Sequence, residues 1–341
     1  MPEPTTGPRP TLEAVAARAG VSRATVSRVV NGAAGVRAPL VDKVRRAVDE
    51  LGYVPNHAAR TLVTRRNGAV GVVIAEPEFR IFTDPFFERQ LRGISRELTA
   101  YDTQLVLLWA EGAAEYGRIA SYLAGGHVDG ALAFSLHNDD ELPAMIARAR
   151  IPTVFGGRPA AGQNLTVPYV DCDNRGGARE AVRHLVSLGR RRIGHIAGPR
   201  DLMAAVDRAD GYRDVLADAD PALTAQGDFT QDSGARAMAE LLDRRPDLDA
   251  VFAANDLMAA GALRTLRERG AKVPEDVAVV GFDDVPSVAG ATDPALTTVH
   301  QDIEGMGRLM VRLLTRLLED GDGPAPEPVI TPTELVRRAS A

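Results

Sequence analysis

Residues 11 to 30 constrain the fold of this chain most, because two short helical patterns meet there at a glycine. The first pattern follows Thr11, whose hydroxyl can cap the free N–H groups of a helix. Its apolar side chains recur at helical spacing as far as Gly20, which ends it. Ser22 can cap a second helix in the same way. The stretch therefore predicts two helices joined by a tight turn.

The second helix divides its side chains between two faces. At about 100° per residue, its three valines fall on one side, which predicts the buried face. The opposite arc of roughly 140° carries Arg23, Ala24, Ser27 and Arg28. Arginines and small residues on an exposed second helix are what a helix-turn-helix needs to enter a DNA major groove. Two packed helices of another small bundle are the alternative interpretation of this pattern alone.

A third helical pattern, Pro39 to Leu51, ends at Gly52, and a further short phrase follows it. Taken together, ARAGVSRATVSRVVNG and LGYVPNHAARTL resemble the DNA-binding headpiece and hinge helix of the LacI family of bacterial transcription regulators. The hinge, residues 56–63, is too short to be a stable isolated helix. The resemblance implies that it orders on DNA against its twin from a second subunit.

The same resemblance implies that Leu62 enters the minor groove and separates two base pairs, a wedge that bends the duplex. Burial of Leu62 against the rest of the protein is the alternative. The predicted DNA contacts are Ser22, Arg23, Ala24, Thr25, Ser27, Arg28, Asn56, Arg60 and Leu62.

Charge separates the head of the chain from the remainder. Residues 1–66 contain 11 Lys or Arg against 5 Asp or Glu, a net charge of +6, whereas the rest has 29 against 41, a net of −12. A basic head on an acidic body predicts a polyanionic partner for the head alone.

Few other features point to special chemistry. Cys172 is the only cysteine, which excludes an intrachain disulfide and a cysteine metal cluster; we interpret it as a small apolar residue beside a strand. We predict no metal site and no cofactor.

Residues 1–10 are expected to be a disordered tail, since they are rich in proline and lack the apolar region of a signal peptide. Without a run of 18 apolar residues, the chain is expected to be cytoplasmic, at the nucleoid, with no membrane partner.

From Ala69 onward, apolar runs of strand length alternate with helical patterns, which is typical of parallel sheets with crossover helices. The expected strands are 70–75, 105–109, 130–134, 153–155, 193–197, 250–253 and 277–281. The expected helices are 86–100, 115–124, 141–149, 177–188, 233–243, 256–269 and 303–318. So many strands favour two α/β lobes with a cleft between them.

This half resembles the periplasmic-binding-protein-like effector domain of the same family, through DPFFERQLRGI, DNRGGAREAVRHLVSLGRRRIGHIAGP, DRADGYRDVL, ANDLMAAGAL, VAVVGFDDVP and ALTTVHQD. The expected fold is thus a small all-α helix-turn-helix domain, residues 11–66, followed by a two-lobed α/β domain with parallel sheets, residues 69–341. The resemblance places the N-terminal lobe at about 69–158 and 302–329. The C-terminal lobe would be about 159–301 and 330–341, with three crossings and hinge closure.

Position alone suggests where a ligand would bind. Ligands of open parallel sheets lie beyond the carboxyl ends of the strands, and Asn255 and Asp283 each follow a strand run. Asp256 is more readily a helix N-cap, and Asp173 and Asp284 more readily turn or capping residues. Motif by motif, the resemblance assigns the effector contacts to Phe86, Phe87, Arg208, Phe229, Asn255 and Asp283.

An arginine, an amide, a carboxylate and aromatic rings suit a hydroxyl-rich ligand, so a sugar is expected. A purine is the alternative, and it is disfavoured because Leu202 stands where purine-responsive members have a second arginine, although Arg200 lies nearby. EPEFRIFTDPFF is longer than usual between the first strand and the PFF phrase, which leaves the size and identity of the ligand open.

Other classes of function fit less well. An enzyme of the doubly wound class would carry GxGxxG, GxSxG or HExxH, and none occurs. A free sugar-binding protein would lack the basic head and have a signal peptide.

A single helix-turn-helix with a paired hinge implies a twofold dimer on a pseudo-palindromic operator, and without a leucine heptad tail a tetramer is not expected. We therefore predict a ligand-responsive transcription regulator, most simply a repressor. The effector, the operator and the sign of the response stay open.

Overall fold

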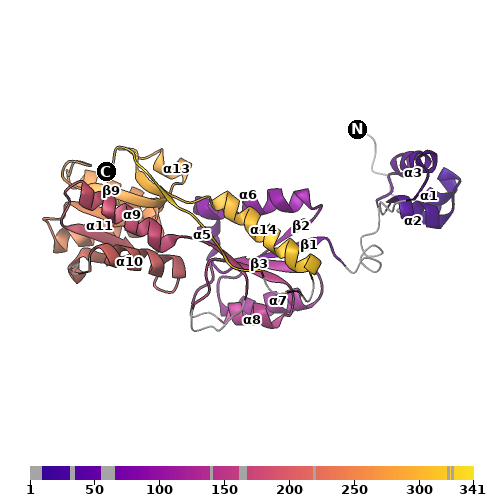
Figure 1. Cartoon of the computed structure of the whole chain (residues 1–341), viewed down its shortest axis with the longest axis horizontal. Helices are drawn as coiled ribbons and strands as arrows, with labels where there is room; N and C mark the ends of the chain where they lie inside the picture. Colours follow the sequence, from indigo (N-terminus) through magenta and orange to yellow (C-terminus); the bar gives the residue numbers. More distant parts are fainter. Residues whose placement is uncertain are drawn as a thin grey trace. The chain divides into compact units, whose positions relative to one another are not determined.

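The computed structural model describes residues 10–30, 35–54, 66–138, 141–160, 167–217, 220–320, 323 and 326–341. It divides into two compact units, Met1–Asn67 and Gly68–Ala341, which are described separately below. Figure 1 shows a small helical headpiece and a larger body with two lobes. No described helix is both long enough and apolar enough to cross a membrane.

Three helices form the headpiece: α1 (Leu12–Ala19), α2 (Arg23–Val30) and α3 (Ala38–Leu51). The predicted cap of α1 is confirmed, because the Thr11 hydroxyl accepts a hydrogen bond from the Ala14 amide at 3.3 Å. Gly20 ends the helix with φ of 66°, a left-handed conformation that glycine adopts without strain. One apolar face of each helix meets in a core of Val15, Ala16, Val26, Val44, Ala47 and Tyr53.

The first lobe of the body is built on a six-stranded parallel sheet in the order β11-β5-β4-β3-β1-β2. Its strands are β1 (Ala69–Ile74), β2 (Gln104–Trp109), β3 (Gly130–Phe134), β4 (Thr153–Gly156), β5 (Tyr169–Cys172) and β11 (Val329–Thr331). Helices α6 (Pro85–Ala100) and α14 (Ile303–Asp320) lie together on one face, as Figure 1 shows, and α7 (Ala113–Ala124) and α8 (Leu142–Arg148) cover the other. The short α5 (Glu78–Thr83) follows β1 directly.

Close packing of α6 on α14 depends on glycine. A Cβ at Gly93 would lie 2.1 Å from the carbonyl oxygen of Glu304, so only glycine allows the two backbones to approach this closely. These helices are far apart in sequence, and their contact ties the last part of the chain to the first lobe.

The second lobe has its own six-stranded sheet, ordered β12-β10-β9-β8-β6-β7 and parallel except for β12, which runs antiparallel to β10. Its strands are β6 (Ile193–Ala197), β7 (Thr224–Gln226), β8 (Ala250–Ala253), β9 (Ala278–Asp283), β10 (Thr297–His300) and β12 (Glu334–Val336). Its helices are α9 (Asn174–Ser187), α10 (Met203–Val215), α11 (Gln231–Arg244), α12 (Asp256–Glu268) and α13 (Pro286–Ala289), with a 3-10 turn η2 (Pro221–Leu223). The predicted fold class is confirmed.

The predicted boundary between the lobes at residue 158 is wrong. Strand β5 pairs with β4 in the first sheet, so the chain leaves the first lobe after Cys172. The return crossing also shifts, because Ile330 and Thr331 pair with β5 rather than joining the second lobe. Both errors have one cause: these strands are three or four residues long and carry polar side chains, so they lack the apolar run that marks a buried strand.

Several elements, β5 and β11 among them, carried no clear pattern in the sequence. They are α5, α10 and α13 among the helices and β5, β7, β10, β11 and β12 among the strands. The long stretch that precedes the PFF phrase is therefore not a simple loop, since it contains α5. This helix brings side chains to the cleft that the sequence did not assign there.

Candidate functional site

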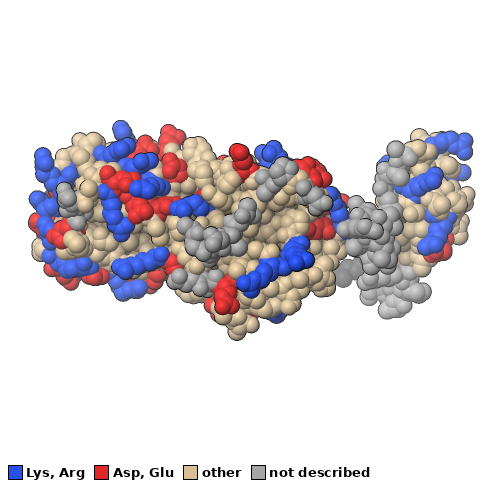
Figure 2. Space-filling model, turned by 60° about the horizontal axis from the view of Figure 1, so that its bottom comes forward, with Lys and Arg blue, Asp and Glu red and all other residues tan. Residues whose placement is uncertain are grey.

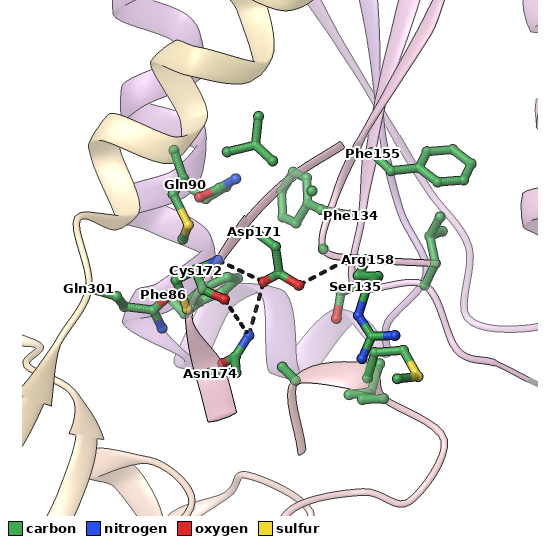
Figure 3. Close-up of a pocket in the computed structure, with 18 of the residues that line it drawn as sticks. Phe86, Gln90, Phe134, Ser135, Phe155, Arg158, Asp171, Cys172, Asn174 and Gln301 are labelled. Atoms are coloured by element: carbon green, nitrogen blue, oxygen red, sulfur yellow. Dashed lines mark hydrogen bonds between the residues drawn. The ribbon is translucent and has the colours of Figure 1, made fainter. Parts of the chain in front are cut away.

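A pocket lies between the two lobes, beyond the carboxyl ends of strands from both sheets (Figure 3). All six predicted effector contacts line it: Phe86, Phe87, Arg208, Phe229, Asn255 and Asp283. Residues that the sequence did not single out complete the polar lining, among them Arg80, Asp84, Gln90, Arg158, Asp171, Asn174 and Gln301.

Arg208 and Asp283 form a buried ion pair in the second lobe, with Nη1 and Oδ1 3.1 Å apart. The guanidinium also donates to the Ala254 carbonyl at 2.6 Å and to Asn174 Oδ1 at 2.9 Å, while its carbon lies 3.7 Å from the centre of the Phe282 ring. Burial raises the pKa of Asp283 above its ordinary value, and the positive charge of Arg208 offsets only part of this rise. A charged group in such a site is worth more to a ligand than in water, because little solvent screens it.

Gln301, which belongs to neither a helix nor a strand, adds a hydrogen bond to the Arg208–Asp283 pair. Its amide donates to Asp283 Oδ1 at 2.6 Å, and it sits where the chain crosses back from β10 toward α14. The Asp283 backbone itself has φ of 108°, a value that side-chain-bearing residues rarely adopt. Such strain at a strand end is typical of residues held in place for binding.

Asp171 organises the junction between β5 and α9 (Figure 3). Its carboxylate accepts hydrogen bonds from the amides of Cys172 and Arg158 and from the Asn174 side chain, at 2.8, 3.0 and 2.9 Å. Asp173, as predicted, is a capping residue, because its side chain accepts from the Gly176 amide. Asn174 was missed, and its only signal was its place two residues after the strand YVDC, at the start of α9.

Asn255 and Phe229 are joined in the second lobe. The Asn255 amide donates to the Phe229 carbonyl at 3.0 Å, and its oxygen accepts from the Met258 amide at 2.9 Å. Asn255 is therefore the N-cap of α12, which corrects the prediction that Asp256 would cap it. Asp256 instead lies buried within the helix, where its carboxylate accepts from the Val285 amide.

Aromatic rings line the first-lobe side of the pocket. The Phe87 ring stacks on Phe134 with centroids 6.2 Å apart and lies nearly perpendicular to the Phe86 ring, with centroids 5.5 Å apart. Phe87 is 1% exposed and Phe86 only partly buried, so Phe86 is the more accessible of the predicted pair.

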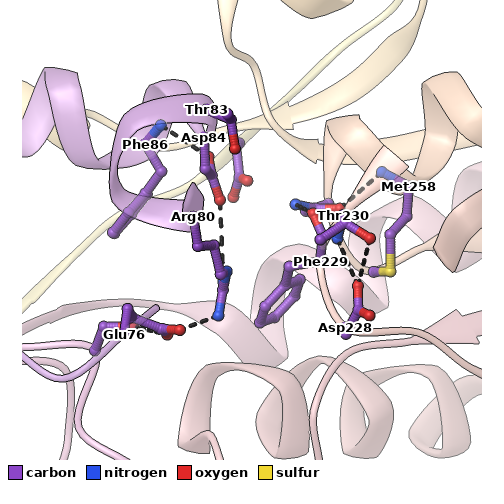
Figure 4. Close-up of polar contacts among 12 residues, drawn as sticks. Glu76, Arg80, Thr83, Asp84, Phe86, Asp228, Phe229, Thr230 and Met258 are labelled. Atoms are coloured by element: carbon purple, nitrogen blue, oxygen red, sulfur yellow. Dashed lines mark hydrogen bonds and ion pairs between the residues drawn. The ribbon is translucent and has the colours of Figure 1, made fainter. Parts of the chain in front are cut away.

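Arg80 reaches the pocket from α5 and is 8% exposed (Figure 4). Its Nη1 donates to Glu76 at 2.6 Å, and its Nη2 lies 3.9 Å from Asp84. The guanidinium carbon lies 5.7 Å from the centre of Phe87 and 5.4 Å from the centre of Phe229, which belongs to the other lobe. Burial raises the pKa of Asp84 to about 6, and the carboxylate of Asp283 adds to this rise.

Several polar contacts cross between the lobes beside the pocket, among them the hydrogen bond from the Asn138 amide to the Asp201 carbonyl at 2.7 Å. The His137 imidazole of the first lobe lies 2.6 Å from the Asp201 carboxylate of the second, and Arg158 donates to Asp207 of α10 at 2.6 Å. Arg200, considered above as a purine contact, is exposed and donates to Gln226 at 3.2 Å; it does not line the pocket, whereas Leu202 does.

The predicted DNA-contact face of α2 is exposed in the headpiece. Ser22, Arg23, Ala24 and Arg28 are exposed, and Thr25 and Ser27 are half-buried. The Ser22 hydroxyl accepts from the Thr25 amide at 3.2 Å, in agreement with its predicted capping role. Arg23 pairs with Glu13 at 2.9 Å, and basic side chains are spread over the headpiece in Figure 2. Asn56, Arg60 and Leu62 lie outside the described residues.

No cluster of three His, Cys, Asp or Glu side chains that could hold a metal occurs in the part of the chain that the structure describes. Cys172 is a free, buried thiol at the end of β5, and burial raises its pKa. The polar groups of the pocket instead form donor–acceptor pairs beside aromatic rings, an arrangement suited to binding a neutral, hydroxyl-rich molecule.

Comparisons with known proteins agree with this arrangement. Residues 11–56 match the model of bacterial regulatory proteins of the lacI family, and residues 182–341 match a periplasmic-binding-protein-like domain. The HTH-type transcriptional regulator CelR of Thermobifida fusca is 50% identical over 97% of this chain and 98% of its own. A solved complex of transcriptional regulator CelR with cellobiose is 47% identical, with a TM-score of 0.78, and covers 98% of this chain and 100% of its own. The lac repressor dimer bound to operator and the anti-inducer ONPF is 28% identical, with a TM-score of 0.86, over 98% and 99% of the two chains.

Proposed function

Because the chain belongs to the LacI family of bacterial regulatory proteins, we propose that it represses transcription from a pseudo-palindromic operator and that a sugar controls this repression. It is a DNA-binding transcriptional regulator and not an enzyme. Because its target is operator DNA, it acts in the cytoplasm, at the nucleoid.

The headpiece supports the DNA part of the proposal. Exposed Arg23 and Arg28 lie on the second helix of a helix-turn-helix, the helix that enters the major groove in this motif. The other proposed contacts are Ala24, Thr25 and Ser27 of α2, Ser22 immediately before that helix, and Asn56, Arg60 and Leu62 of the hinge. Two headpieces are needed to read a twofold operator, so the active form is a homodimer, the state named for the lac repressor relative.

The pocket supports the sugar part, and one observation carries it. The Arg208–Asp283 ion pair, the Asn255 amide and Phe229 all line a single pocket. Vicinal hydroxyls can bind an arginine–carboxylate pair, while the apolar C–H face of a pyranose stacks on an aromatic ring. Since a relative is solved with cellobiose, cellobiose is the first sugar to test.

A thermal-shift screen of the purified protein tests the proposal. The panel contains cellobiose, glucose, ribose, other disaccharides and purines. A ligand at 100 times its dissociation constant should add about 2.7 kcal/mol to the free energy of unfolding. Operator binding is then titrated with and without the sugar that stabilises the protein. Stabilisation by purines alone, or a sugar that binds without changing operator affinity, would contradict the proposal.

A further inference from the structure

Arg80 occupies the boundary between the two lobes, and nothing in the sequence pattern marked it. We propose that Arg80 is a ligand-contacting residue that determines sugar specificity and converts sugar binding into a change in operator affinity. This inference rests on the proposed function, since it concerns the same pocket and a sugar ligand.

The donors of Arg80 are only partly used. A guanidinium has five N–H groups, and here one donates to Glu76 at 2.6 Å while Nη2 lies 3.9 Å from Asp84, beyond hydrogen-bond distance. The Nε is buried and has no hydrogen-bond partner among the described residues. A buried donor without a partner costs free energy, so a hydroxyl oxygen that accepts from this Nε would relieve that cost.

The position of Phe229 brings a ligand that packs on its ring close to Arg80. One edge of the Phe229 ring packs against Gly198, where an added Cβ would lie 2.5 Å from Cε1 and Cζ. The Arg80 guanidinium lies over the ring, 5.4 Å from its centre, as Figure 4 shows. A sugar bound next to the Phe229 ring on this side therefore lies within reach of the Arg80 N–H groups.

Arg80 is also prepared for this contact by its neighbours. Glu76 is 2% exposed and accepts hydrogen bonds from both Arg80 and the Ser135 hydroxyl. The Ser135 contact holds the Glu76 carboxylate in place, and this carboxylate in turn holds the Arg80 guanidinium. Asp84 lies on the other side and caps α6 through the Phe86 amide at 3.0 Å. The guanidinium is thereby presented to the cleft in one orientation, which favours selection among hydroxyl patterns.

The lobes to which these residues belong explain the coupling. Arg208, Asp283, Asn255 and Phe229 all belong to the second lobe, so their contacts with a ligand survive when the lobes separate. Arg80 belongs to the first lobe, so a ligand touches both sets only when the lobes are closed. A ligand shifts an equilibrium only through contacts that differ between the two states. The Arg80 contact is such a difference.

The test uses the full-length protein, cellobiose and operator DNA. Arg80→Met removes the donors and keeps most of the side chain's length, and Arg80→Lys keeps the positive charge beside Glu76. Arg96→Met is the matched control, because Arg96 is an exposed arginine of α6 that pairs with Glu304, away from the pocket. Calorimetric titration gives the cellobiose affinity, and operator titrations with and without saturating cellobiose give their ratio.

In Arg80→Met, cellobiose affinity is expected to fall about 10- to 100-fold, the value of a hydrogen bond to a charged group. The ratio of operator affinities should move toward one by a similar factor, because the coupling is reciprocal. Arg80→Lys should lie between wild type and Arg80→Met, and Arg96→Met should match wild type in both measurements.

The possible outcomes separate the alternatives. Cellobiose affinity within twofold of wild type in both Arg80 variants would overturn the inference. A weaker affinity with an unchanged operator ratio would also overturn it, because Arg80 would then only maintain the shape of the pocket. If Arg80→Met does not fold, Arg80→Lys decides by the same criteria. Absence of cellobiose binding in the wild-type protein would count against the proposed ligand instead.

Discussion

His137 and Asp201 join the two lobes of the body, with the imidazole Nδ1 2.6 Å from the carboxylate Oδ2. The other ring nitrogen lies 3.5 Å from Glu76, the carboxylate that also holds Arg80. One imidazole therefore links the second lobe to the network that positions Arg80. An imidazolium is favoured here, because the hydrogen bonds with Glu76 and Asp201 raise the pKa of His137 to about 9.

This contact predicts a pH dependence of stability. The folded-state pKa of His137 lies above its ordinary value of 6.5, so the contribution of the imidazolium is complete below pH 6.5 and is lost as the pH rises through about 9. The melting temperature of the body should fall over that interval. His137→Asn should lower the melting temperature at pH 7 and remove this part of the slope. Thermal denaturation of both proteins from pH 6 to 10 checks it, and equal slopes would contradict it.

Arg28 should read a base in each half-site. An arginine that contacts guanine with two hydrogen bonds contributes about 1 to 3 kcal/mol against a wrong base, and Arg28 is exposed on α2. We expect Arg28→Ala to relax specificity at one position of each half-site. A binding-site selection with both proteins measures this, and an identical base preference would refute the assignment.

Leu62 should bend the operator. If its side chain separates two base pairs, Leu62→Ala should reduce both the bend and the operator affinity, while the melting temperature without DNA stays unchanged. Gel phasing measures the bend, and calorimetry measures the melting temperature. A large loss of stability without DNA would indicate that Leu62 is a core residue.

The Arg208–Asp283 pair should determine sugar affinity. Removing a hydrogen bond from a charged group costs about 1.5 to 3 kcal/mol, or roughly 10- to 100-fold in affinity. Arg208→Ala and Asp283→Asn should weaken sugar binding by about that factor. Operator affinity without sugar should change at most a few-fold, because the headpiece is a separate compact unit. If the sugar is an inducer, both variants will repress permanently.

Calorimetric titration with the sugar and operator titration without it measure the two effects. Unchanged sugar affinity in both variants would place the ligand elsewhere. Loss of operator binding in both would instead assign a structural role to the pair.

Local signals were sufficient wherever a short segment decides its own conformation. The Thr11 cap, the left-handed Gly20 and the valine face of α2 belong to consecutive turns of chain, and the headpiece has the helices that they predict. Long apolar strands such as β1 and β9 were equally clear, because a strand buried on both faces is apolar throughout. The carboxyl ends of such strands also pointed to Asn255 and Asp283.

The sequence by itself thus determined the fold class, the helix-turn-helix of the headpiece and the strand ends that line the pocket. Only the tertiary structure decided that β5 belongs to the first sheet and that Arg80 lies over Phe229. The physical reason is the same for both. A four-residue strand is stabilised by the partners it pairs with, and an arginine on a short helix reaches a ring of the other lobe through packing between distant segments. Neither relation leaves a periodic pattern in the chain, because the residues that create it are far apart in sequence.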